Sequence, residues 1–360
     1  MRIAISTGGG DAPGLNAVIR GAVLAAIQRG WSVYGIQRSF GGLLGNDKVI
    51  MLDRDAVRGI THVGGTILGT TNRGDPFKWP VTQADGTVIE VDRSDELITA
   101  FHAHGFDALI TIGGDGSLRI ALQLFKKGLP VIGVPKTIDN DVGGTVLTFG
   151  FDTAVATATD ALDKLHSTAE SHERVMVVEL MGRYAGWIAL NSGISGSADV
   201  ILIPEIPYDM DRICGKIIER EKHGRRFSLV VVAEGAMPKG GRVKVKGEAA
   251  KGGGMERLGG IAEVVAAEIG RRTGKDTRAL TLGHLQRGGS PTTFDRLLSL
   301  RFGAAAVRCV AAGTFGTMVS LQPPTIKAVP LEDVVGKPKP VPLDSDTVLT
   351  ARDLGICLGD

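Results

Sequence analysis

The sequence is poor in cysteine, and its cysteines do not form close pairs. Cys214, Cys309 and Cys357 are the three, and they lie far apart along the chain. Structural zinc sites and disulfide frameworks need closely spaced cysteines, so this spacing argues against both. We therefore expect the protein to work in a reducing compartment.

The sequence also lacks an excess of charge and any long hydrophobic run. Its 41 lysines and arginines are almost balanced by 39 aspartates and glutamates, for a formal net charge of +2. There is no basic tail that would bind nucleic acid, and no run of about 18 apolar residues that would cross a membrane. We expect a soluble cytoplasmic protein without nucleic-acid or membrane partners, whose anionic ligands are small and locally bound.

Aromatic residues are scarce, at 5%, whereas the chain of 360 residues contains 51 glycines. This composition is typical of many tight turns between strands and helices. Short apolar runs predict buried parallel strands, and helical apolar spacing follows the first two of them. The runs lie at 2–6, 108–112, 130–134, 175–180, 200–203 and 229–233. Strands that alternate with helices predict an α/β fold with ligands at the carboxyl ends of the strands.

The first glycine-rich turn, residues 7–14, joins the first strand to the first helix. Such a turn can present free backbone N–H groups at a helix N-terminus, where the helix dipole favours phosphate. A purely structural turn between strand and helix is the alternative.

A second turn, Gly-Gly-Asp-Gly-Ser at 113–117, follows another apolar strand. Its glycines allow close approach of a ligand, and the Asp115 carboxylate could hold Mg²⁺ on phosphate groups. NAD kinases and diacylglycerol kinases share the pattern, so it indicates a phosphoryl donor without identifying the acceptor. The alternative is that Asp115 is only a turn or helix-cap residue.

A third segment, Pro-Lys-Thr-Ile-Asp-Asn-Asp at 135–141, follows the strand at 130–134 and carries two carboxylates. Phosphoryl transfer asks the protein mainly for alignment, charge neutralisation and one carboxylate that takes the proton of the acceptor hydroxyl. We interpret Asp139 as that base.

Five motifs in this order make the chain resemble the 6-phosphofructokinase family. They are Gly-Gly-Asp at 9–11, the turn at 113–117, Thr-Ile-Asp-Asn-Asp at 137–141, Met-Gly-Arg-x-x-Gly at 181–186, and Gly-His-Leu-Gln-Arg-Gly-Gly-Ser-Pro at 283–291. Residues 169–187 resemble the branch that mixes ATP- and pyrophosphate-dependent enzymes. The resemblance implies a kinase that phosphorylates the 1-hydroxyl of fructose 6-phosphate with Mg²⁺ and ATP. A pyrophosphate-dependent phosphotransferase and a non-catalytic sugar-phosphate sensor are the alternatives.

The resemblance also assigns roles to individual residues. Catalysis is given to Lys136, Thr137, Asp139 and Arg183. The sugar-phosphate pocket takes Thr137, Ile138, Asp139, Met181, Gly182, Arg183, Glu234, His284, Leu285, Gln286 and Arg287. The donor side takes Gly10, Arg73, Gly114, Asp115, Gly116 and Ser117, with Asp115 as the Mg²⁺ ligand.

Arg174 and Arg278 match family arginines that reach the pocket from a neighbouring subunit. The resemblance therefore implies a homodimer or homotetramer with shared active sites. Ordinary solvated ion pairs are the alternative for these two arginines.

The expected architecture is two three-layer α/β domains with mostly parallel sheets. Residues 1–150 with roughly 256–312 would bind the donor, and residues 151–255 with 313–360 would bind the sugar phosphate. The Gly- and Lys-rich stretch at 238–254 is predicted to be a loop, and the Pro-rich tail from Pro323 a strap over the surface.

Two residues give opposite indications about the donor. In the family, glycine after the Asp of the second turn leaves room for the α-phosphate of ATP, and here this residue is Gly116. Lys136, in contrast, stands where pyrophosphate users usually carry lysine. We favour ATP, because an aspartate at this position would block ATP by its volume and charge and glycine does not. The added cation of Lys136 is compatible with the phosphates of ATP.

Leu24 stands where allosteric relatives carry a second arginine after Arg20, so we expect weak or different control.

Overall fold

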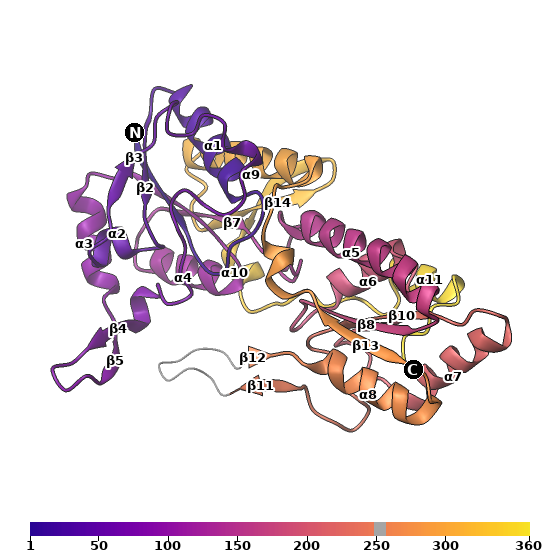
Figure 1. The fold of residues 1–360 in the computed structure, drawn as a ribbon. Coiled ribbons are helices and arrows are strands. Elements are labelled where there is room, and N and C mark those ends of the chain that lie inside the picture. The colour runs from indigo at the N-terminus through magenta and orange to yellow at the C-terminus, as the bar shows by residue number, and fades with distance from the viewer. Residues whose placement is uncertain (248–256) are drawn as a thin grey trace. The chain divides into compact units, whose positions relative to one another are not determined.

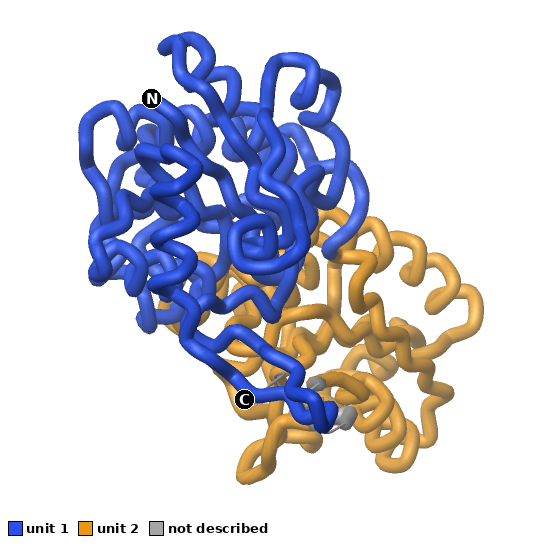
Figure 2. The backbone as a smooth tube through the Cα atoms, turned by 90° about the vertical axis from the view of Figure 1, so that its left-hand side faces the viewer, with its two compact units in different colours: residues 1–138, 142–153, 287–338 blue, residues 139–141, 154–286, 339–360 orange. Residues whose placement is uncertain are grey.

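The computed structural model describes residues 1–247 and 257–360, and the chain divides into two compact units (Figure 2). Unit 1 comprises Met1–Ile138, Val142–Thr153 and Arg287–Pro338. Unit 2 comprises Asp139–Asp141, Ala154–Gln286 and Lys339–Asp360. The predicted loop at 238–254 lies in part outside the described residues. No helix of the described residues is long and apolar enough to cross a membrane.

Unit 1 is built on a seven-stranded sheet in the order β15-β14-β7-β6-β1-β2-β3. Figure 1 labels β2, β3, β7 and β14 among these strands. The strands are β1 (Arg2–Thr7), β2 (Ser32–Ile36), β3 (Val49–Met51), β6 (Ala108–Gly113), β7 (Val131–Pro135), β14 (Thr317–Gln322) and β15 (Thr325–Pro330). The edge strands β3 and β15 pair antiparallel with their neighbours, and the other pairs are parallel. A separate hairpin is formed by β4 (Trp79–Thr82) and β5 (Val88–Val91).

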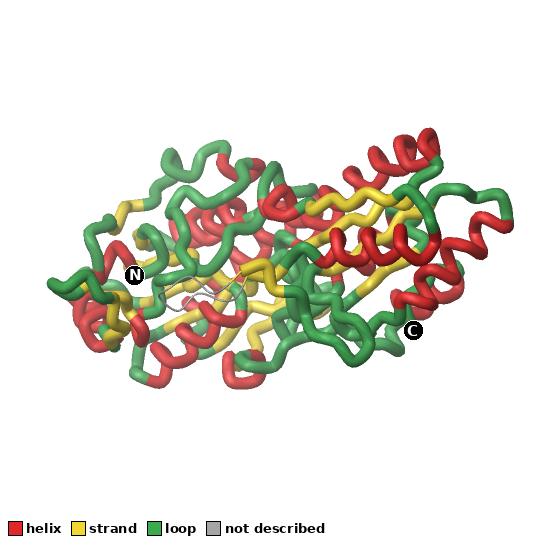
Figure 3. The backbone as a smooth tube through the Cα atoms, turned by 60° about the horizontal axis from the view of Figure 1, so that its bottom comes forward, coloured by secondary structure: helices red, strands yellow, loops and turns green. Residues whose placement is uncertain are grey.

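Helices pack on both faces of this sheet (Figure 3), because side chains alternate along each strand. In β1, Ile3 and Ile5 pack with α1 (Leu15–Ile27) and α9 (Thr293–Ala311), whereas Ala4 packs with α3 (Ser94–Ala103) and α4 (Asp115–Lys126). Each buried Ile or Leu contributes about 1.5–3 kcal/mol of transfer free energy. Short helices α2 (Gly41–Leu44) and α10 (Leu331–Val334) complete the unit.

Helices α1 and α9 approach each other at backbone distance. A Cβ atom at Gly21 would lie 2.7 Å from the Leu300 carbonyl oxygen, and one at Gly303 would lie 2.3 Å from the Val18 carbonyl oxygen. Only glycine fits either position without moving a helix.

Unit 2 contains a parallel four-stranded sheet in the order β13-β8-β10-β9. Its strands are β8 (Val175–Leu180), β9 (Val200–Leu202), β10 (Ser228–Ala233) and β13 (Thr277–Thr281), and β11 (Val245–Gly247) pairs with β12 (Arg257–Leu258). One face of the sheet packs on α7 (Met210–Lys222) and α8 (Ile261–Thr273). The unit also contains α6 (Trp187–Ser195), α11 (Asp346–Asp353) and most of α5 (Phe151–His172).

The α/β architecture and all six predicted strands are confirmed within one or two residues. The strap predicted from Pro323 is wrong, because this tail forms an edge strand and two helices.

The units also differ in extent from the expected domains. Strand β14 pairs with β7 and so brings 313–338 into unit 1, whereas β13 pairs with β8 and so keeps 277–286 in unit 2. The donor and sugar-phosphate roles of the domains stay predictions.

Candidate active site

The carboxyl ends of β1 and β6 lie at a topological switch point in unit 1. These strands are neighbours, with Thr7 opposite Ile112. From β1 the chain passes through α1 on one face to β2, and from β6 it passes through α4 on the other face to β7. Ligands of open α/β sheets bind where the connections diverge in this way. Both predicted glycine turns begin there.

In the first turn, the N–H of Gly8 donates to the Ile112 carbonyl at 2.9 Å, and that of Gly9 donates to the Thr71 carbonyl at 3.2 Å. Helix α1 begins only at Leu15. The prediction that this turn presents free N–H groups at a helix start is therefore wrong for Gly8 and Gly9. For a ligand, this leaves the N–H groups of the turn from Gly10 onward.

Lys136 connects the turns that follow β1, β6 and β7. Its backbone N–H donates to the Gly113 carbonyl at 2.9 Å, and its buried ammonium group donates to the Gly10 carbonyl. Arg287 lies beside the same turn, with Nη1 donating to the Asp11 carbonyl at 3.2 Å. Two cations thus lie at the first turn, where they favour an anion. Arg287, predicted for the sugar-phosphate pocket, lies in unit 1 beside the predicted donor turn.

The second turn is the start of a helix. Gly114 is the N-cap of α4 and Asp115 is its first residue. The Asp115 carboxylate accepts from the Gly336 N–H at 3.0 Å and pairs with Arg119 at 2.7 Å. A Cβ atom at Gly116 would meet no atom within 4 Å. The helix start therefore has open space around Gly116.

The residues of this turn fit a Mg²⁺ ion that is shared with phosphate groups. Mg²⁺ is commonly held by one or two carboxylates together with phosphate oxygens and water. Asp115 supplies one half-exposed carboxylate at a helix N-terminus. Residues 1–247 and 257–360 contain no cluster of three His, Cys, Asp or Glu side chains that would hold a metal without a ligand.

Arg73 and Ser117 were also predicted on the donor side. Arg73 is exposed, and its N–H donates to the Thr71 hydroxyl at 3.1 Å, on the loop that accepts from Gly9. Ser117 lies in the first turn of α4, where a Cβ atom at Gly8 would lie 2.8 Å from its hydroxyl oxygen. Both residues therefore lie on segments that contact the first turn.

In unit 2, the ends of β8 and β10 bring the Met-Gly-Arg motif beside Glu234. The N–H of Glu234 donates to the Leu180 carbonyl at 2.9 Å, and that of Gly235 donates to the Gly182 carbonyl at 3.1 Å. The Arg183 guanidinium lies 5.4 Å from the centre of the exposed Tyr184 ring. Met181, Gly182, Arg183 and Glu234 therefore form one edge of the sheet.

The Gly-His-Leu-Gln-Arg segment follows β13 at the same edge. His284 and Leu285 are exposed there. Gln286 is fully buried: its Oε1 accepts from the Met181 N–H at 3.3 Å, and its Nε2 donates to the Gly283 carbonyl at 3.1 Å. Gln286 thus holds two motifs together.

Asp139, the predicted base, lies in a turn that is bonded to Lys339, a residue that the sequence did not predict. Asn140, between Asp139 and Asp141, has a left-handed φ of 52°. Lys339 donates from Nζ to Asn140 Oδ1 at 2.9 Å, and its N–H donates to the Asp141 carbonyl at 2.9 Å. Burial lowers the pKa of Lys339 to about 8, although Asp141 acts in the opposite direction.

Lys339 was missed because it is 199 residues from Asn140, in a Pro-rich tail that matches no motif. Thr137 and Ile138, which precede the turn, belong to unit 1. The Thr137 carbonyl accepts from the Thr148 hydroxyl at 2.7 Å, and the Ile138 side chain is buried.

Arg174 and Arg278 lie at the opposite end of the unit 2 sheet. Arg174 precedes β8, and Arg278 is near the start of β13. Both contact the Asp276 carboxylate, Arg174 through Nε at 2.5 Å, and the hydrogen bond from Arg174 is the main cause of the lowered pKa of Asp276. The six residues of β8 span about 20 Å, so these arginines are separated from Met181 and His284 within one chain.

The predicted effector position carries no cation in the structure. Leu24 packs, partly buried, against the core of unit 1. Arg20 donates from Nη1 to the Val57 carbonyl at 2.6 Å. The expectation of weak or different control stays a prediction.

Several known proteins similar to this chain are described as phosphofructokinases. A family model described as phosphofructokinase matches residues 2–310. The ATP-dependent 6-phosphofructokinase of Chloroflexus aggregans is 52% identical over 360 residues, covering 100% of this chain and 98% of that protein. The ATP-dependent 6-phosphofructokinase 1 of Synechocystis is 50% identical over 363 residues. The solved structure of Pichia pastoris phosphofructokinase is 31% identical with a TM-score of 0.79, and the match covers 99% of this chain and 37% of that longer one.

Proposed function

The chain belongs to the phosphofructokinase family, and from this membership we infer that it is an ATP-dependent 6-phosphofructokinase. It transfers a phosphoryl group from Mg-ATP to the 1-hydroxyl of fructose 6-phosphate, giving fructose 1,6-bisphosphate and ADP, a step of glycolysis. The structural observation that best supports this reaction is the pair of glycine turns at the switch point between β1 and β6. Nucleotide phosphates bind at such crevices in open α/β sheets.

On the donor side, we propose that ATP phosphates lie between the first turn and the start of α4. Lys136 and Arg287 contact that turn, and the α4 N-terminus adds its dipole. Asp115 would hold Mg²⁺, which neutralises charge on the phosphates when it is bound. Binding would require the Asp115 carboxylate to exchange its contact with Arg119, an exposed pair of small energetic value.

On the acceptor side, we propose that Asp139 takes the proton of the sugar 1-hydroxyl. A positioned base of this kind contributes roughly 10²–10⁴ to the rate. Arg183 would stabilise charge on the transferring phosphoryl group, since a guanidinium presents several donors in a fixed plane. Glu234 would accept hydrogen bonds from sugar hydroxyls, and His284 would contact the 6-phosphate.

The open space around Gly116 supports ATP as the donor. ATP carries an α-phosphate that pyrophosphate lacks, and a glycine at the start of α4 leaves room for it. Lys136, the residue that pointed toward pyrophosphate, contacts the Gly10 carbonyl. In that place its charge is as compatible with the phosphates of ATP as with a diphosphate.

We propose a homodimer or homotetramer whose active sites are shared between subunits. The position of Arg174 and Arg278, one strand length from Met181 and His284, supports this arrangement. They would complete the sugar-phosphate pocket of a neighbouring copy of the chain. We also propose a cytoplasmic location, which the three free cysteines and the use of ATP support.

A coupled assay on purified protein tests the function directly. Fructose 6-phosphate and Mg²⁺ are supplied with either ATP or pyrophosphate in parallel. We expect turnover with ATP and little with pyrophosphate. Turnover with pyrophosphate alone would identify the phosphotransferase instead, and sugar-phosphate binding without turnover on either donor would identify a sensor.

A further inference from the structure

The turn that carries Asp139 has a backbone shape that depends on its surroundings. Asn140 is 2% exposed and has a φ of 52°, in the left-handed region that residues with a side chain adopt at a cost, although Asn adopts it more readily than most. Such residues persist where neighbouring groups hold them, and they concentrate at functional sites. The groups that hold this turn are therefore candidates for a role in the reaction.

Lys339 bonds to this turn at two points, through its side chain to Asn140 and through its backbone to Asp141. Lys339 is itself held in place by the first residue of α6. The Trp187 Nε1 donates to the Lys339 carbonyl at 2.9 Å, and the Lys339 ammonium lies 5.6 Å from the centre of the Trp187 ring. A continuous set of contacts thus runs from α6 through Lys339 to the turn.

We propose that Lys339 is a positioning residue for phosphoryl transfer: by holding Asn140 and Asp141, it fixes the Asp139 carboxylate where the sugar hydroxyl must lose its proton. This inference rests on the proposed function, in which Asp139 is the base. Lys339 acts through the turn and does not contact the substrates. Small displacements of a catalytic group are costly, and about 1 Å can lower a rate by roughly 10².

Replacing Lys339 by methionine tests this role, because the apolar stem is retained while the ammonium is removed. We expect Lys339→Met to lower kcat about 10- to 100-fold, with KM for ATP and fructose 6-phosphate within about threefold of wild type. Lys337→Met is the matched control: it removes an exposed lysine two residues away, and kcat should not change.

A double-mutant cycle separates positioning from a general loss of stability. If Lys339 acts through Asn140, then Lys339→Met should have little further effect on kcat in the Asn140→Ala background. Should the methionine variant fail to fold, Lys339→Arg keeps the positive charge, and the same fall in kcat at unchanged KM is expected from its altered geometry.

Unchanged kcat in a folded Lys339 variant, or fully additive effects in the cycle, would overturn the positioning role. Wild-type protein that does not turn over fructose 6-phosphate with ATP would instead overturn the proposed function. The two failures are therefore distinguishable.

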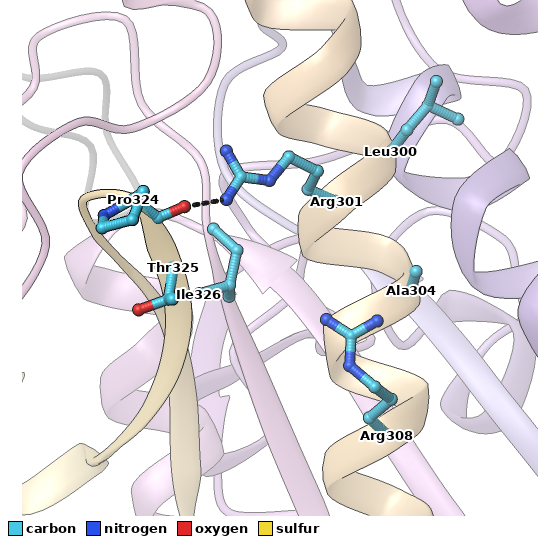
Figure 4. Close-up of a pocket in the computed structure, with 7 residues that line it drawn as sticks. All are labelled: Leu300, Arg301, Ala304, Arg308, Pro324, Thr325 and Ile326. Carbon is cyan, nitrogen blue, oxygen red and sulfur yellow. Dashed lines mark hydrogen bonds between the residues drawn. The ribbon is translucent and has the colours of Figure 1, made fainter.

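A different observation, in unit 1, points to a second ligand site. A cavity of about 480 Å³ lies between α9 and the turn that joins β14 to β15 (Figure 4), and it contains none of the predicted site residues. Ala304 and Ile326 give it apolar walls, and Arg301 and Arg308 contribute positive charge. The two arginines lie two helical turns apart, on one face of α9.

The charges around this cavity are of one sign. Arg301 is held over it by a hydrogen bond from Nη2 to the Pro324 carbonyl at 2.6 Å. An adjoining cavity of about 240 Å³ shares Arg308 and Ile326 and adds Lys327. Within the described part of the chain, no carboxylate lines either cavity. Guanidinium groups next to apolar surface suit a phosphate ester with an apolar body.

We infer that this cavity binds a small phosphate monoester that carries an apolar group, at a site separate from the donor turns. Phenyl phosphate is a suitable probe, measured by calorimetry beside inorganic phosphate and phenol. We expect it to bind in the millimolar range or better, and more tightly than either part alone.

Variants of the two arginines decide whether binding occurs at this cavity. Arg301→Ala combined with Arg308→Ala should weaken phenyl phosphate binding at least tenfold. Arg308→Ala alone, which leaves the Arg301 contact with Pro324 intact, should weaken it several-fold. Arg225→Ala, at an exposed position of unit 2, is the control and should bind as wild type does. Equal binding by the double variant, or no binding by wild type, would overturn the inference.

Discussion

Replacing Asp139 removes the proposed proton acceptor while leaving the contacts that shape its turn. Asp139→Asn should lower kcat by roughly 10²–10⁴, with KM for both substrates nearly unchanged, because the lost group acts in the transition state. The bonds from Lys339 to Asn140 and Asp141 do not involve the Asp139 side chain, so the variant should keep them. Steady-state kinetics with ATP and fructose 6-phosphate measure the effect, and a near-normal kcat would remove Asp139 from the role of base.

Gly116 carries the most specific residue-scale prediction, which concerns donor choice. Gly116→Asp should abolish turnover with ATP, because the new carboxylate adds volume and like charge beside the α-phosphate. It should destabilise the ATP-bound state by several kcal/mol. The protein itself should accept the change, since a Cβ atom there meets no atom within 4 Å.

Gly116→Ala is the matched control for this substitution, because it adds only the Cβ atom. It should retain most ATP turnover. Rates of both variants with ATP and with pyrophosphate are needed, since Lys136 remains in place to hold a shorter donor. An aspartate variant that still uses ATP well would show that Gly116 does not line the donor site.

At the scale of elements, the first turns of α5 and α9 cap each other. The Asp295 carboxylate, in α9, accepts from the Thr153 N–H at 2.8 Å and from its hydroxyl at 2.6 Å. The Thr292 hydroxyl, at the N-cap of α9, accepts from the Asp295 N–H at 3.2 Å and donates to Asp152 at 2.5 Å. Side chains thus satisfy backbone donors at both helix starts. The 283–291 motif ends directly before this cluster.

This cluster makes stability depend on pH. Burial raises the pKa of Asp295 to about 6, above its ordinary value of 3.8, so folding favours the protonated form. The stabilisation by the proton is fully present below about pH 4 and is lost as the pH rises to about 6. The loss is on the order of 3 kcal/mol, from about 1.4 kcal/mol per pKa unit.

Asp295→Asn should remove this dependence, because an amide does not titrate. The difference in free energy of unfolding, wild type minus variant, should therefore decrease as the pH rises from about 4 to about 6. Above about pH 6 the difference should stay constant. Denaturant titrations at several pH values measure it, and the lost hydrogen bonds add only an offset that does not change with pH. Parallel pH profiles for the two proteins would contradict the prediction.

The elements that sequence reasoning predicted well are those with local signals. An apolar run identifies β1 or β6 by itself, and glycine spacing identifies the turns that follow. The partner of each strand is a long-range property, so the segments that contain β13 and β14 lie in other units than the expected domain bounds gave. Gln286 and Arg287 are adjacent in one motif, yet one is buried in unit 2 and the other contacts the first turn of unit 1. A motif specifies which residues matter but not which of them face a ligand.

At the scale of the whole molecule, the shared active site predicts which variants can restore each other. In the proposed arrangement, a pocket takes Asp139 from its own subunit and Arg174 from the neighbour. Asp139→Asn and Arg174→Ala proteins should each be nearly inactive alone. After mixing and subunit exchange, a random dimer population should regain about a quarter of its active sites, since half of the dimers are hybrids with one intact pocket.

Mixing Arg174→Ala with Arg278→Ala is the control, because both arginines come from the same side of the pocket and no hybrid has an intact site. Activity is measured before and after exchange, with exchange confirmed by mass. No recovery in the first mixture, or equal recovery in both, would contradict a shared pocket.

The chain passes between its two units at 138/139, 141/142, 153/154, 286/287 and 338/339. Neither unit is therefore a continuous stretch of gene. Exchange of a single continuous segment would cut through the reaction motifs or separate Lys339 from Asn140, so neither unit can be exchanged as one continuous piece. The shortest continuous segment that contains all the motifs and Lys339 is nearly the entire chain.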